Sequence, residues 1–338
     1  MLGTDADFDT AAAPVQVGAD QPRYLTDYSP QDKPWDVHRA QTQRVEGVYR
    51  DTVYDGLAGR LHDCSGFLGF AWVDDSVTGE LRLRLRTARF CRVRHCPVCQ
   101  WRRSLMWQAR FLKALPAIEA AYPTARWLFL TLTVRNCAIT DLRRTLRSMN
   151  EAWHRLVKRP EFAGNVQGWV RTTEVTRGRD DSAHPHFHCL LMIKPGYFAG
   201  KNYVTQSRWT DLWRECARLD YQPIVDIRTV KARHGAPGEK PLRQALAETL
   251  KYAVKPSDME GEWLLELTRQ VHKLRFLASG GVLKNVLRES DESEQDLLLA
   301  DGNGEGGDPV LFFSWGRDIR RYVERQLPAE PLKTRGKR

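Results

Sequence analysis

The sequence predicts an α+β protein with a central, mainly antiparallel β-sheet flanked by helices, preceded by a cysteine-rich segment. From residue 126 to residue 255, strand-like and helix-like segments follow one another in the order strand, helix, strand, strand, helix, strand, helix. Strands and helices of this kind assemble into an antiparallel sheet with helices against it. Upstream, four of the seven cysteines lie within residues 64–99, a clustering typical of a metal site.

The composition is that of a globular protein, with 42% hydrophobic and 28% charged residues. No run of about 18 apolar residues occurs, so we expect no transmembrane helix and no membrane partner. The acidic N-terminus lacks the basic and apolar regions of a signal peptide. We therefore expect a cytoplasmic protein, in which seven cysteines are not disulfide-bonded.

The net charge of +10 is unevenly distributed along the chain. Residues 1–36 are acidic, and residues 289–308 contain eight acidic side chains and no basic one. The region between them is therefore strongly basic, which suggests a polyanionic partner. Charge alone does not distinguish DNA, RNA or an anionic membrane.

The chain divides into four predicted parts. Residues 1–45 show no clear period and are predicted to form a mobile acidic arm. Residues 46–122 form the cysteine-rich segment with a basic helix, and residues 123–280 form the α+β domain. Residues 281–338 form an acidic linker and a short C-terminal element.

The predicted elements follow from the spacing of apolar residues. In the cysteine-rich segment, three leucines at residues 81, 83 and 85 alternate with arginines, as in a half-exposed strand. A helix follows over residues 103–122, and Pro116 should kink or divide it. Predicted strands cover residues 67–73, 81–85, 127–134, 169–176, 187–193 and 223–230. The other predicted helices cover residues 141–158, 207–218, 242–254 and 261–277.

Three histidines alternate within five residues and indicate a metal site. His184, His186 and His188 share one face of a strand, because side chains alternate between faces. A turn centred near residue 180 would place Glu174 opposite His186 in an antiparallel hairpin, as a third ligand. This set of nitrogen and oxygen ligands suits Mg²⁺ or Mn²⁺, and Zn²⁺ also remains possible. His184, Asp180 and Asp181 are weaker ligand candidates.

The cysteine cluster predicts a structural zinc site. Cys91, Cys96 and Cys99 supply three thiolates and Cys64 the natural fourth, in a closed set of four sulfurs. His62 or His95 could replace one thiolate. The other three cysteines are expected to be core residues. Arginines and tryptophans within residues 92–107 would suit a nucleic-acid surface, or simply a partly packed helix.

Tyr252 is the candidate nucleophile. It shares a face with Glu248 on the predicted helix, and Lys255 adjoins it. Nearby cations favour the phenolate, which can attack a phosphodiester. A tyrosine on an amphipathic helix is, however, more often a packing residue.

Taken together, three segments resemble the motifs of the HUH endonucleases. They are residues 129–133, 184–188 and 251–255, in this order. More closely, they resemble the plasmid rolling-circle replication initiators of the Rep_1 family, which also carry a cysteine cluster upstream. The resemblance covers about residues 60–260.

The resemblance implies an HUH endonuclease fold and a nickase domain over residues 123–280. His186 and His188 match the paired metal ligands, and Tyr252 matches the nucleophile that forms a covalent 5′-phosphotyrosine and frees a 3′-OH primer. The implied partners are single-stranded and supercoiled plasmid origin DNA, a host helicase and a DNA polymerase. Because the segment has one tyrosine, Glu248 could activate water for a second cleavage.

Other functions remain open from the sequence. A transposase or relaxase would use the same parts, although relaxases usually place the tyrosine before the histidines. A zinc-stabilised DNA-binding protein without catalysis is a second alternative. A metal-dependent hydrolase of other substrates is a third.

Overall fold

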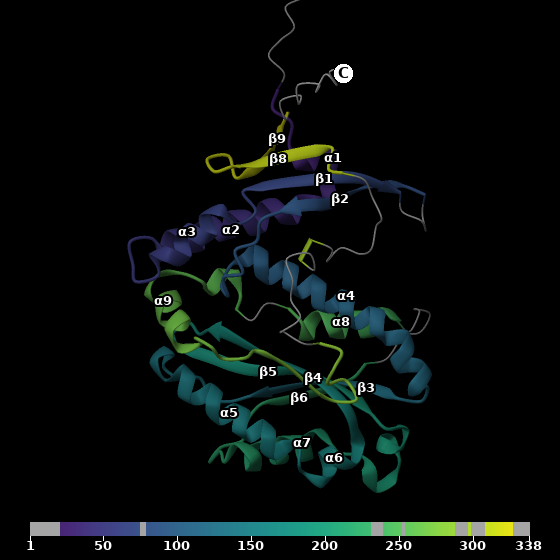
Figure 1. The fold of residues 1–338 in the computed structure, drawn as a ribbon. Helices are drawn as coiled ribbons and strands as arrows, with labels where there is room; N and C mark the ends of the chain where they lie inside the picture. Colours follow the sequence, from purple (N-terminus) through teal and green to yellow (C-terminus); the bar gives the residue numbers. More distant parts are fainter. Residues whose placement is uncertain are drawn as a thin grey trace, which may run out of the picture.

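The computed structural model describes residues 21–74, 79–230, 239–251, 254–287, 297–298 and 308–326. These residues form two antiparallel sheets with helices packed against them (Figure 1). The α+β prediction, with a central antiparallel sheet flanked by helices, is therefore confirmed. No described helix has both the length and the apolar character needed to cross a membrane.

The central sheet has five strands in the order β6-β3-β5-β4-β7. They are β3 (Arg126–Thr133), β4 (Val166–Arg177), β5 (Ala183–Ile193), β6 (Val225–Thr229) and β7 (Leu277–Gly281). Every neighbouring pair is antiparallel. β5 lies between β3 and β4, so its side chains are flanked on both sides, and most of them are buried.

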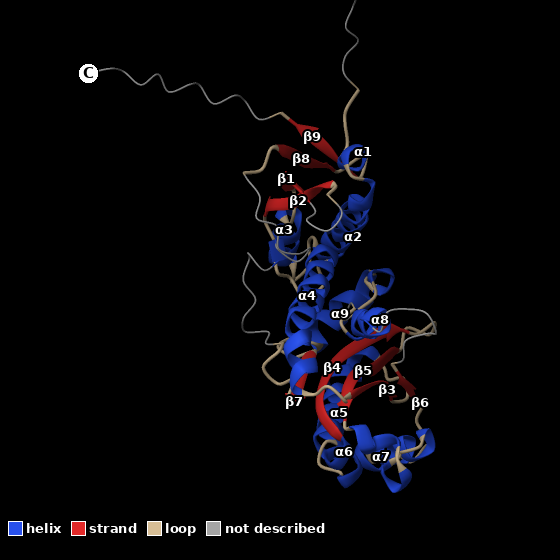
Figure 2. Ribbon diagram, turned by 90° about the vertical axis from the view of Figure 1, so that its right-hand side faces the viewer, coloured by secondary structure: helices blue, strands red, loops and turns tan. Residues whose placement is uncertain are grey.

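Helices cover both faces of this sheet (Figure 2). They are α5 (Leu142–Leu156), α6 (Pro160–Asn165), α7 (Gln206–Ala217), α8 (Glu239–Thr249) and α9 (Gly261–Gln270). On one face, Trp153 of α5 and Trp213 of α7 contact Phe187 of β5 edge to face. α8 packs on the other face, against β4 and β5. The even-numbered side chains of β5 therefore lie beneath α8.

The second sheet has four strands in the order β2-β1-β8-β9. They are β1 (Phe67–Asp74), β2 (Leu81–Ala88), β8 (Leu311–Gly316) and β9 (Arg321–Arg325). The helices of this region are α1 (Leu25–Tyr28), α2 (Lys33–Tyr49), α3 (Asp55–Asp63) and α4 (Pro97–Ala121). Trp35 of α2 packs edge to face on Phe70 of β1, so α2 covers this sheet. α4 runs from this region to the central sheet (Figure 1).

Short 3-10 helices complete the described structure: η1 (Pro30–Asp32), η2 (Ile139–Asp141), η3 (Pro195–Phe198), η4 (Gly200–Asn202) and η5 (Pro256–Asp258).

The predicted mobile arm over residues 1–45 is wrong from Leu25 onward, because α2 is a helix of 17 residues packed into the core. Its buried face includes Arg39, Thr42 and Glu46 beside Trp35 and Tyr49. These polar residues hide the apolar spacing from which a helix is predicted. Residues 1–20 lie outside the described part of the chain.

The C-terminal element is two strands rather than a separate unit. β8 pairs with β1, and β9 pairs with β8, so the end of the chain completes the sheet of the cysteine-rich region. Most of the predicted acidic linker, residues 288–296 and 299–307, lies outside the described residues, as do residues 231–238 of the basic loop.

Three predicted helix boundaries are wrong. α4 starts at Pro97 and continues through Pro116 without a break, so the proline does not divide it. α9 ends at Gln270, residues 271–276 form a turn and a loop, and β7 begins at Leu277 and pairs with β4. α8 ends at Thr249 rather than Val254.

Candidate active site

The β4–β5 hairpin brings together a carboxylate and two histidines. Glu174 lies directly opposite His186, as predicted from a turn centred near residue 180. Glu174 Oε2 lies 3.2 Å from His186 Nε2 and 2.9 Å from His188 Nε2. All three possible ligand atoms lie within 4.8 Å of one another, so the group could hold a metal ion.

His188 is held in place from β3. Thr131 of β3 is its cross-strand partner, and Thr131 Oγ1 lies 3.3 Å from His188 Nδ1. The ring of Phe129 stacks on the His188 ring at 5.5 Å. A hydrogen bond to Nδ1 leaves Nε2 for a ligand, which is the usual arrangement of metal-binding histidines. The segment 129–133 therefore contributes to the orientation of the histidine.

The group is buried, with exposed fractions of 2% for Glu174, 8% for His186 and 6% for His188. Burial alone would raise the pKa of Glu174. Hydrogen bonds from the two histidines and the charge of Lys251 outweigh this effect, so the pKa of this carboxyl is well below its usual value. Glu174 is thus an ionised carboxylate in a group with little exposure to solvent.

Lys251 belongs to the site, although the sequence analysis did not select it. Its Nζ lies 3.0 Å from Glu174 Oε2 and 2.6 Å from Glu248 Oε1. Burial lowers the pKa of Lys251, but its hydrogen bond to Glu248 and the charge of Glu174 raise it by more. A lysine three residues after a glutamate on a predicted helix was the available signal. It did not indicate that Glu174 would lie beside them.

Tyr252 and Ala253 lie outside the described residues, so the predicted place of Tyr252 on a helix is not tested. The chain on both sides is anchored to β4. Thr172 Oγ1 donates a hydrogen bond to the carbonyl of Thr249, and Val254 forms a parallel bridge with Val175. Lys255 is exposed. Glu248 is half-exposed and reaches Glu174 only through Lys251.

His184 is not a member of the group. Its Nδ1 lies 2.7 Å from Asn136 Oδ1, and its ring centre is 5.1 Å from that of His186. Asp180 bonds Ser182, and Asp181 pairs with Arg177, so the two weaker carboxylate candidates are also engaged elsewhere. The structure therefore supports three of the four predicted ligands as one cluster.

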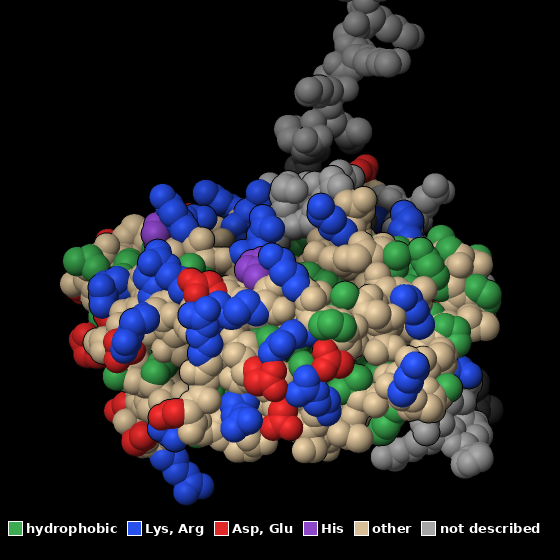
Figure 3. Space-filling view, turned by 90° about the horizontal axis from the view of Figure 1, so that it is seen from below, with side chains coloured by type: hydrophobic (Ala, Val, Ile, Leu, Met, Phe, Trp, Pro, Cys, Tyr) green, Lys and Arg blue, Asp and Glu red, His purple; other side chains and the backbone are tan. Residues whose placement is uncertain are grey.

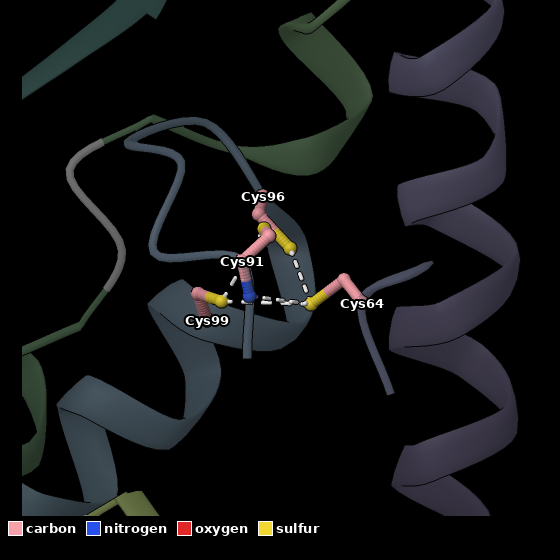
Figure 4. Close-up of side chains that lie close together, drawn as sticks. All are labelled: Cys64, Cys91, Cys96 and Cys99. Carbon is pink, nitrogen blue, oxygen red and sulfur yellow. Dashed lines mark hydrogen bonds between the residues drawn. The ribbon is translucent and has the colours of Figure 1, made fainter. Parts of the chain in front are cut away.

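The four predicted cysteines form a second cluster, near the start of α4 (Figure 4). Cys64 Sγ lies 3.6 Å from both Cys96 Sγ and Cys99 Sγ, and Cys91 Sγ lies 3.7 Å from Cys99 Sγ. All four are buried and none is in a disulfide. This set of sulfur atoms could hold a metal ion.

Backbone amides around the cluster point at sulfur. The N–H of Cys91 donates to Cys64 Sγ, and the N–H of Arg92 donates to Cys99 Sγ. Burial would raise the pKa of Cys96, but hydrogen bonds from the three other thiols outweigh it and lower that pKa well below its usual value. In the same cluster, hydrogen bonds to neighbouring thiols and burial raise the pKa of Cys64 and of Cys99 well above the usual value, so negative charge is favoured at Cys96 and not at every sulfur.

Neither alternative histidine enters this cluster. His62 Nδ1 lies 3.0 Å from Glu46 Oε1. His95 is fully buried, and burial with the nearby Arg94 charge lowers its pKa to about 3. The remaining cysteines agree with the predicted core role in part, because Cys189 and Cys216 are buried and Cys137 is half-buried.

Two arginines of the expected nucleic-acid surface have structural roles instead. Arg102 is fully buried, and its guanidinium donates to the carbonyls of Leu297 and Leu298. Arg94 donates to the carbonyl of Leu274 and lies over the ring of Phe276. That interpretation of the sequence is therefore wrong for these two residues.

A different basic face lies beneath the central sheet. Figure 3 shows Lys and Arg side chains spread over this face, with Asp and Glu between them. Arg144 pairs with Asp141, Arg208 with Glu161 and Arg214 with Asp211. These three arginines of α5 and α7 are paired, so their charge does not by itself indicate a nucleic-acid partner.

Comparison with known proteins identifies a family of replication proteins. The family model for Rep_1, described as a replication protein, matches residues 82–323, which is more than half of the chain. The chain is 37% identical over 292 residues to Protein rep of Bacillus amyloliquefaciens, covering 81% of this chain and 80% of that protein. It is 33% identical over 285 residues to Protein rep of Streptococcus pneumoniae serotype 2, covering 81% and 86%. No solved structure matches the chain.

Proposed function

The chain belongs to the Rep_1 family of replication proteins, and we propose that it initiates plasmid rolling-circle replication by nicking one strand of the origin. The observation that carries this proposal is the buried group of Glu174, His186 and His188, with the chain on both sides of Tyr252 anchored to β4. A metal site beside a candidate nucleophile is what phosphodiester cleavage needs. We further propose that the central sheet and its helices are an HUH nickase domain.

Tyr252 is the proposed nucleophile. Its phenolate oxygen attacks the scissile phosphorus and forms a covalent 5′-phosphotyrosine, while the bond from phosphorus to the 3′ oxygen breaks. The leaving oxygen takes up a proton and becomes a 3′-OH primer. Lys251 and Lys255 flank Tyr252 in the sequence, and their positive charge favours loss of the phenol proton to solvent.

Glu174, His186 and His188 are the proposed ligands of a catalytic Mg²⁺ or Mn²⁺ ion. The fit is supported by the ionised carboxylate and by two Nε2 atoms that face one carboxylate oxygen. When bound, such an ion offsets the charge that builds up on the scissile phosphate. His184, which bonds Asn136, is proposed to position the hairpin rather than to bind the ion.

Glu248 is proposed to act in the second cleavage that ends a replication round. Lys251 forms an ion pair with each of the two carboxylates and so links Glu248 to Glu174. A half-exposed carboxylate at this position is open to water and can accept a proton from it. The water would cut the regenerated origin and leave a 3′-OH and a 5′-phosphate. This 3′-OH would then attack the phosphotyrosine, which closes the single-stranded circle, breaks the bond from phosphorus to the tyrosine oxygen and returns a proton to the phenol of Tyr252.

Cys64, Cys91, Cys96 and Cys99 are the proposed ligands of a structural zinc ion. Four sulfurs about 2.3 Å from a tetrahedral zinc ion lie roughly 3.8 Å apart. The measured separations of 3.6 and 3.7 Å fit that arrangement. This site would join the start of α4 to the loop after α3.

The proposed partners follow from the reaction. The substrate is single-stranded DNA, exposed at the origin of a supercoiled plasmid. Extension of the 3′-OH needs a DNA polymerase, and unwinding of the duplex ahead of it needs a helicase, which the host would supply.

The test uses the full chain, Mn²⁺ and labelled single-stranded oligonucleotides that tile the replicon encoding it. We expect a covalent protein–DNA adduct on one oligonucleotide, with loss of the adduct in Tyr252→Phe. Tyr203→Phe is the matched control, because Tyr203 is an exposed tyrosine that is not a member of the buried group. Specific binding of the origin without any adduct would overturn the nicking mechanism and leave a DNA-binding protein.

A further inference from the structure

A pocket of about 990 Å³ lies in the region of the second sheet, and none of the candidate metal ligands lines it. Its walls come from α2, α3, β1, β8 and the loops beside them. The lining side chains that matter here are Arg39, His62, Phe67, Arg89, Trp315 and Arg317. The pocket thus combines cationic groups with aromatic rings.

Arg39 is the unusual member of this lining. Only 1% of it is exposed, and its Nη2 donates to the carbonyl of His62 at 2.7 Å. Its Nε and Nη1 have no hydrogen-bond partner among the described residues. A buried guanidinium without a paired carboxylate is unfavourable unless an anion compensates for its charge. The ring of Trp315 lies 5.6 Å from the Arg39 guanidinium and offsets part of this charge, and the remaining positive field acts on a ligand in this pocket.

Two further guanidinium groups line the same pocket. Arg317 is already compensated, because its Nη1 lies 3.0 Å from Glu46 Oε2. Arg89 is 77% exposed and lies 3.5 Å from Asp63 Oδ2, a solvent-screened pair that contributes little energy. Arg89 can therefore turn to a phosphate at low cost.

The aromatic part of the lining offers a stacking surface. Phe67 is 39% exposed, and its ring stacks on Phe312 at 5.6 Å, which holds it in one orientation. Trp315 is buried, donates from its Nε1 to Gln43 and lies under the Arg39 guanidinium, so Phe67 is the ring open for stacking. Sites for single-stranded nucleic acid combine such rings, on which bases stack, with cations along the backbone.

We propose that this pocket binds a nucleotide of single-stranded DNA, with its base against Phe67 and its phosphate at Arg89 in the field of Arg39. This inference rests on the proposed function only in taking DNA as the substrate. The pocket is a second DNA contact, distinct from the nicking site. It would hold origin DNA while the Tyr252 segment cuts elsewhere on the strand.

The stacking contact is tested with Phe67→Leu and a fluorescent single-stranded oligonucleotide of mixed sequence. Phe198→Leu is the matched control, because Phe198 is 43% exposed and lies in η3. We expect Phe67→Leu to weaken binding about tenfold, as loss of one stacking ring does, and Phe198→Leu to leave it unchanged. Equal affinities for the two variants would overturn the stacking contact.

The phosphate contact is tested with Arg89→Ala against Arg144→Ala. The control is close, because Arg144 is 81% exposed and pairs with Asp141 as Arg89 pairs with Asp63. Loss of one phosphate contact should reduce the slope of log affinity against log salt concentration by about 0.7 for single-stranded DNA. The same slope in both variants would mean that Arg89 contributes only general surface charge, and would overturn this contact.

A third measurement does not depend on a variant that folds. Ultraviolet cross-linking of the unaltered chain to an oligonucleotide containing photoreactive thymidine should label the peptide that carries Phe67 or Trp315. Labelling of other peptides alone would overturn the proposal. The proposal would also be overturned if an acidic peptide, and not unlabelled single-stranded DNA, displaced the oligonucleotide.

Failure of this inference is distinguishable from failure of the proposed function. If the adduct with Tyr252 forms but Phe67→Leu and Arg89→Ala bind like their controls, only the pocket proposal fails. If both variants weaken binding but no adduct forms on any origin oligonucleotide, the pocket proposal stands and the nicking mechanism fails.

Discussion

The ammonium of Lys251 lies 3.0 Å from Glu174 Oε2, the oxygen that also faces the Nε2 atoms of His186 and His188. One carboxylate oxygen therefore meets three nitrogen atoms at short range. A divalent ion bound to this oxygen and to the two histidines would repel the ammonium. The proposed metal and Lys251 thus compete for Glu174.

This competition predicts the behaviour of Lys251→Ala. We expect the variant to bind Mn²⁺ about three- to tenfold more tightly than the unaltered chain, because a competing cation has been removed (a tenfold change corresponds to about 1.4 kcal/mol). Titration calorimetry measures this directly. Lys255→Ala is the control for metal affinity, because Lys255 is exposed and no ion pair with Glu174 is found for it. Weaker Mn²⁺ binding in Lys251→Ala would contradict the competition.

Thr131→Val tests the support that β3 gives to His188. Valine preserves the shape of threonine but removes the hydroxyl at 3.3 Å from His188 Nδ1. Loss of a hydrogen bond to a metal-binding histidine typically lowers metal affinity about 10–100-fold. Thr210→Val, on α7 with its hydroxyl bonded to the carbonyl of Gln206, is the matched control. Mn²⁺ affinities that agree between the two variants would show that the contact has no such role.

The depressed pKa of Glu174 predicts a pH-dependent contribution to stability. A carboxyl whose pKa is lower in the folded chain stabilises it above the pKa of the unfolded chain, about 4.3, and this contribution is lost as pH falls toward the folded value. In metal-free buffer, the free energy of unfolding should exceed that of Glu174→Gln by about 1.5–3 kcal/mol near neutral pH. Urea unfolding should give a difference that shrinks steadily below about pH 4. A difference that grows in acid would have the wrong sign.

Removal of the proposed zinc should affect the second sheet first. We expect Cys96→Ser to lose the equimolar zinc that the unaltered chain carries, and its thermal unfolding to begin at a lower temperature. Elemental analysis and circular dichroism measure the two effects. Cys137→Ser should keep its zinc, because Cys137 is half-buried and not in the cluster. Full zinc content in Cys96→Ser would exclude that residue as a ligand.

The register of the site was predictable because it is local. Glu174 and His186 belong to one hairpin, and strand periodicity with a single turn centre defines which residues face each other. The cysteine set was predictable for a similar reason, since three of its members lie within nine residues. Short separations leave few alternative arrangements.

Long-range pairings were not predictable in the same way. Nothing local to residues 277–281 indicates that they pair with β4, and the helical prediction extended over part of them. At this edge Gly281 has a φ of +59° and lies against the carbonyl of Gln167, which a Cβ would strike at 2.2 Å. α2 was missed because Arg39 and Glu46, which are buried, look like surface residues in a sequence. Lys251 was passed over because its partner Glu174 is distant in the chain.

The pairing of β1 with β8 has a consequence for the order in which the chain folds. β1 begins at Phe67 and its neighbour β8 at Leu311, so the first sheet to be synthesised lacks an inner strand until β8 has been made. At ribosomal rates of about 5–20 residues per second, β1 waits roughly 12–50 s for β8. The central sheet, whose strands end at Gly281, can form during this interval. A nascent or truncated chain can therefore contain the assembled β4–β5 hairpin, with its histidines, before the second sheet is complete.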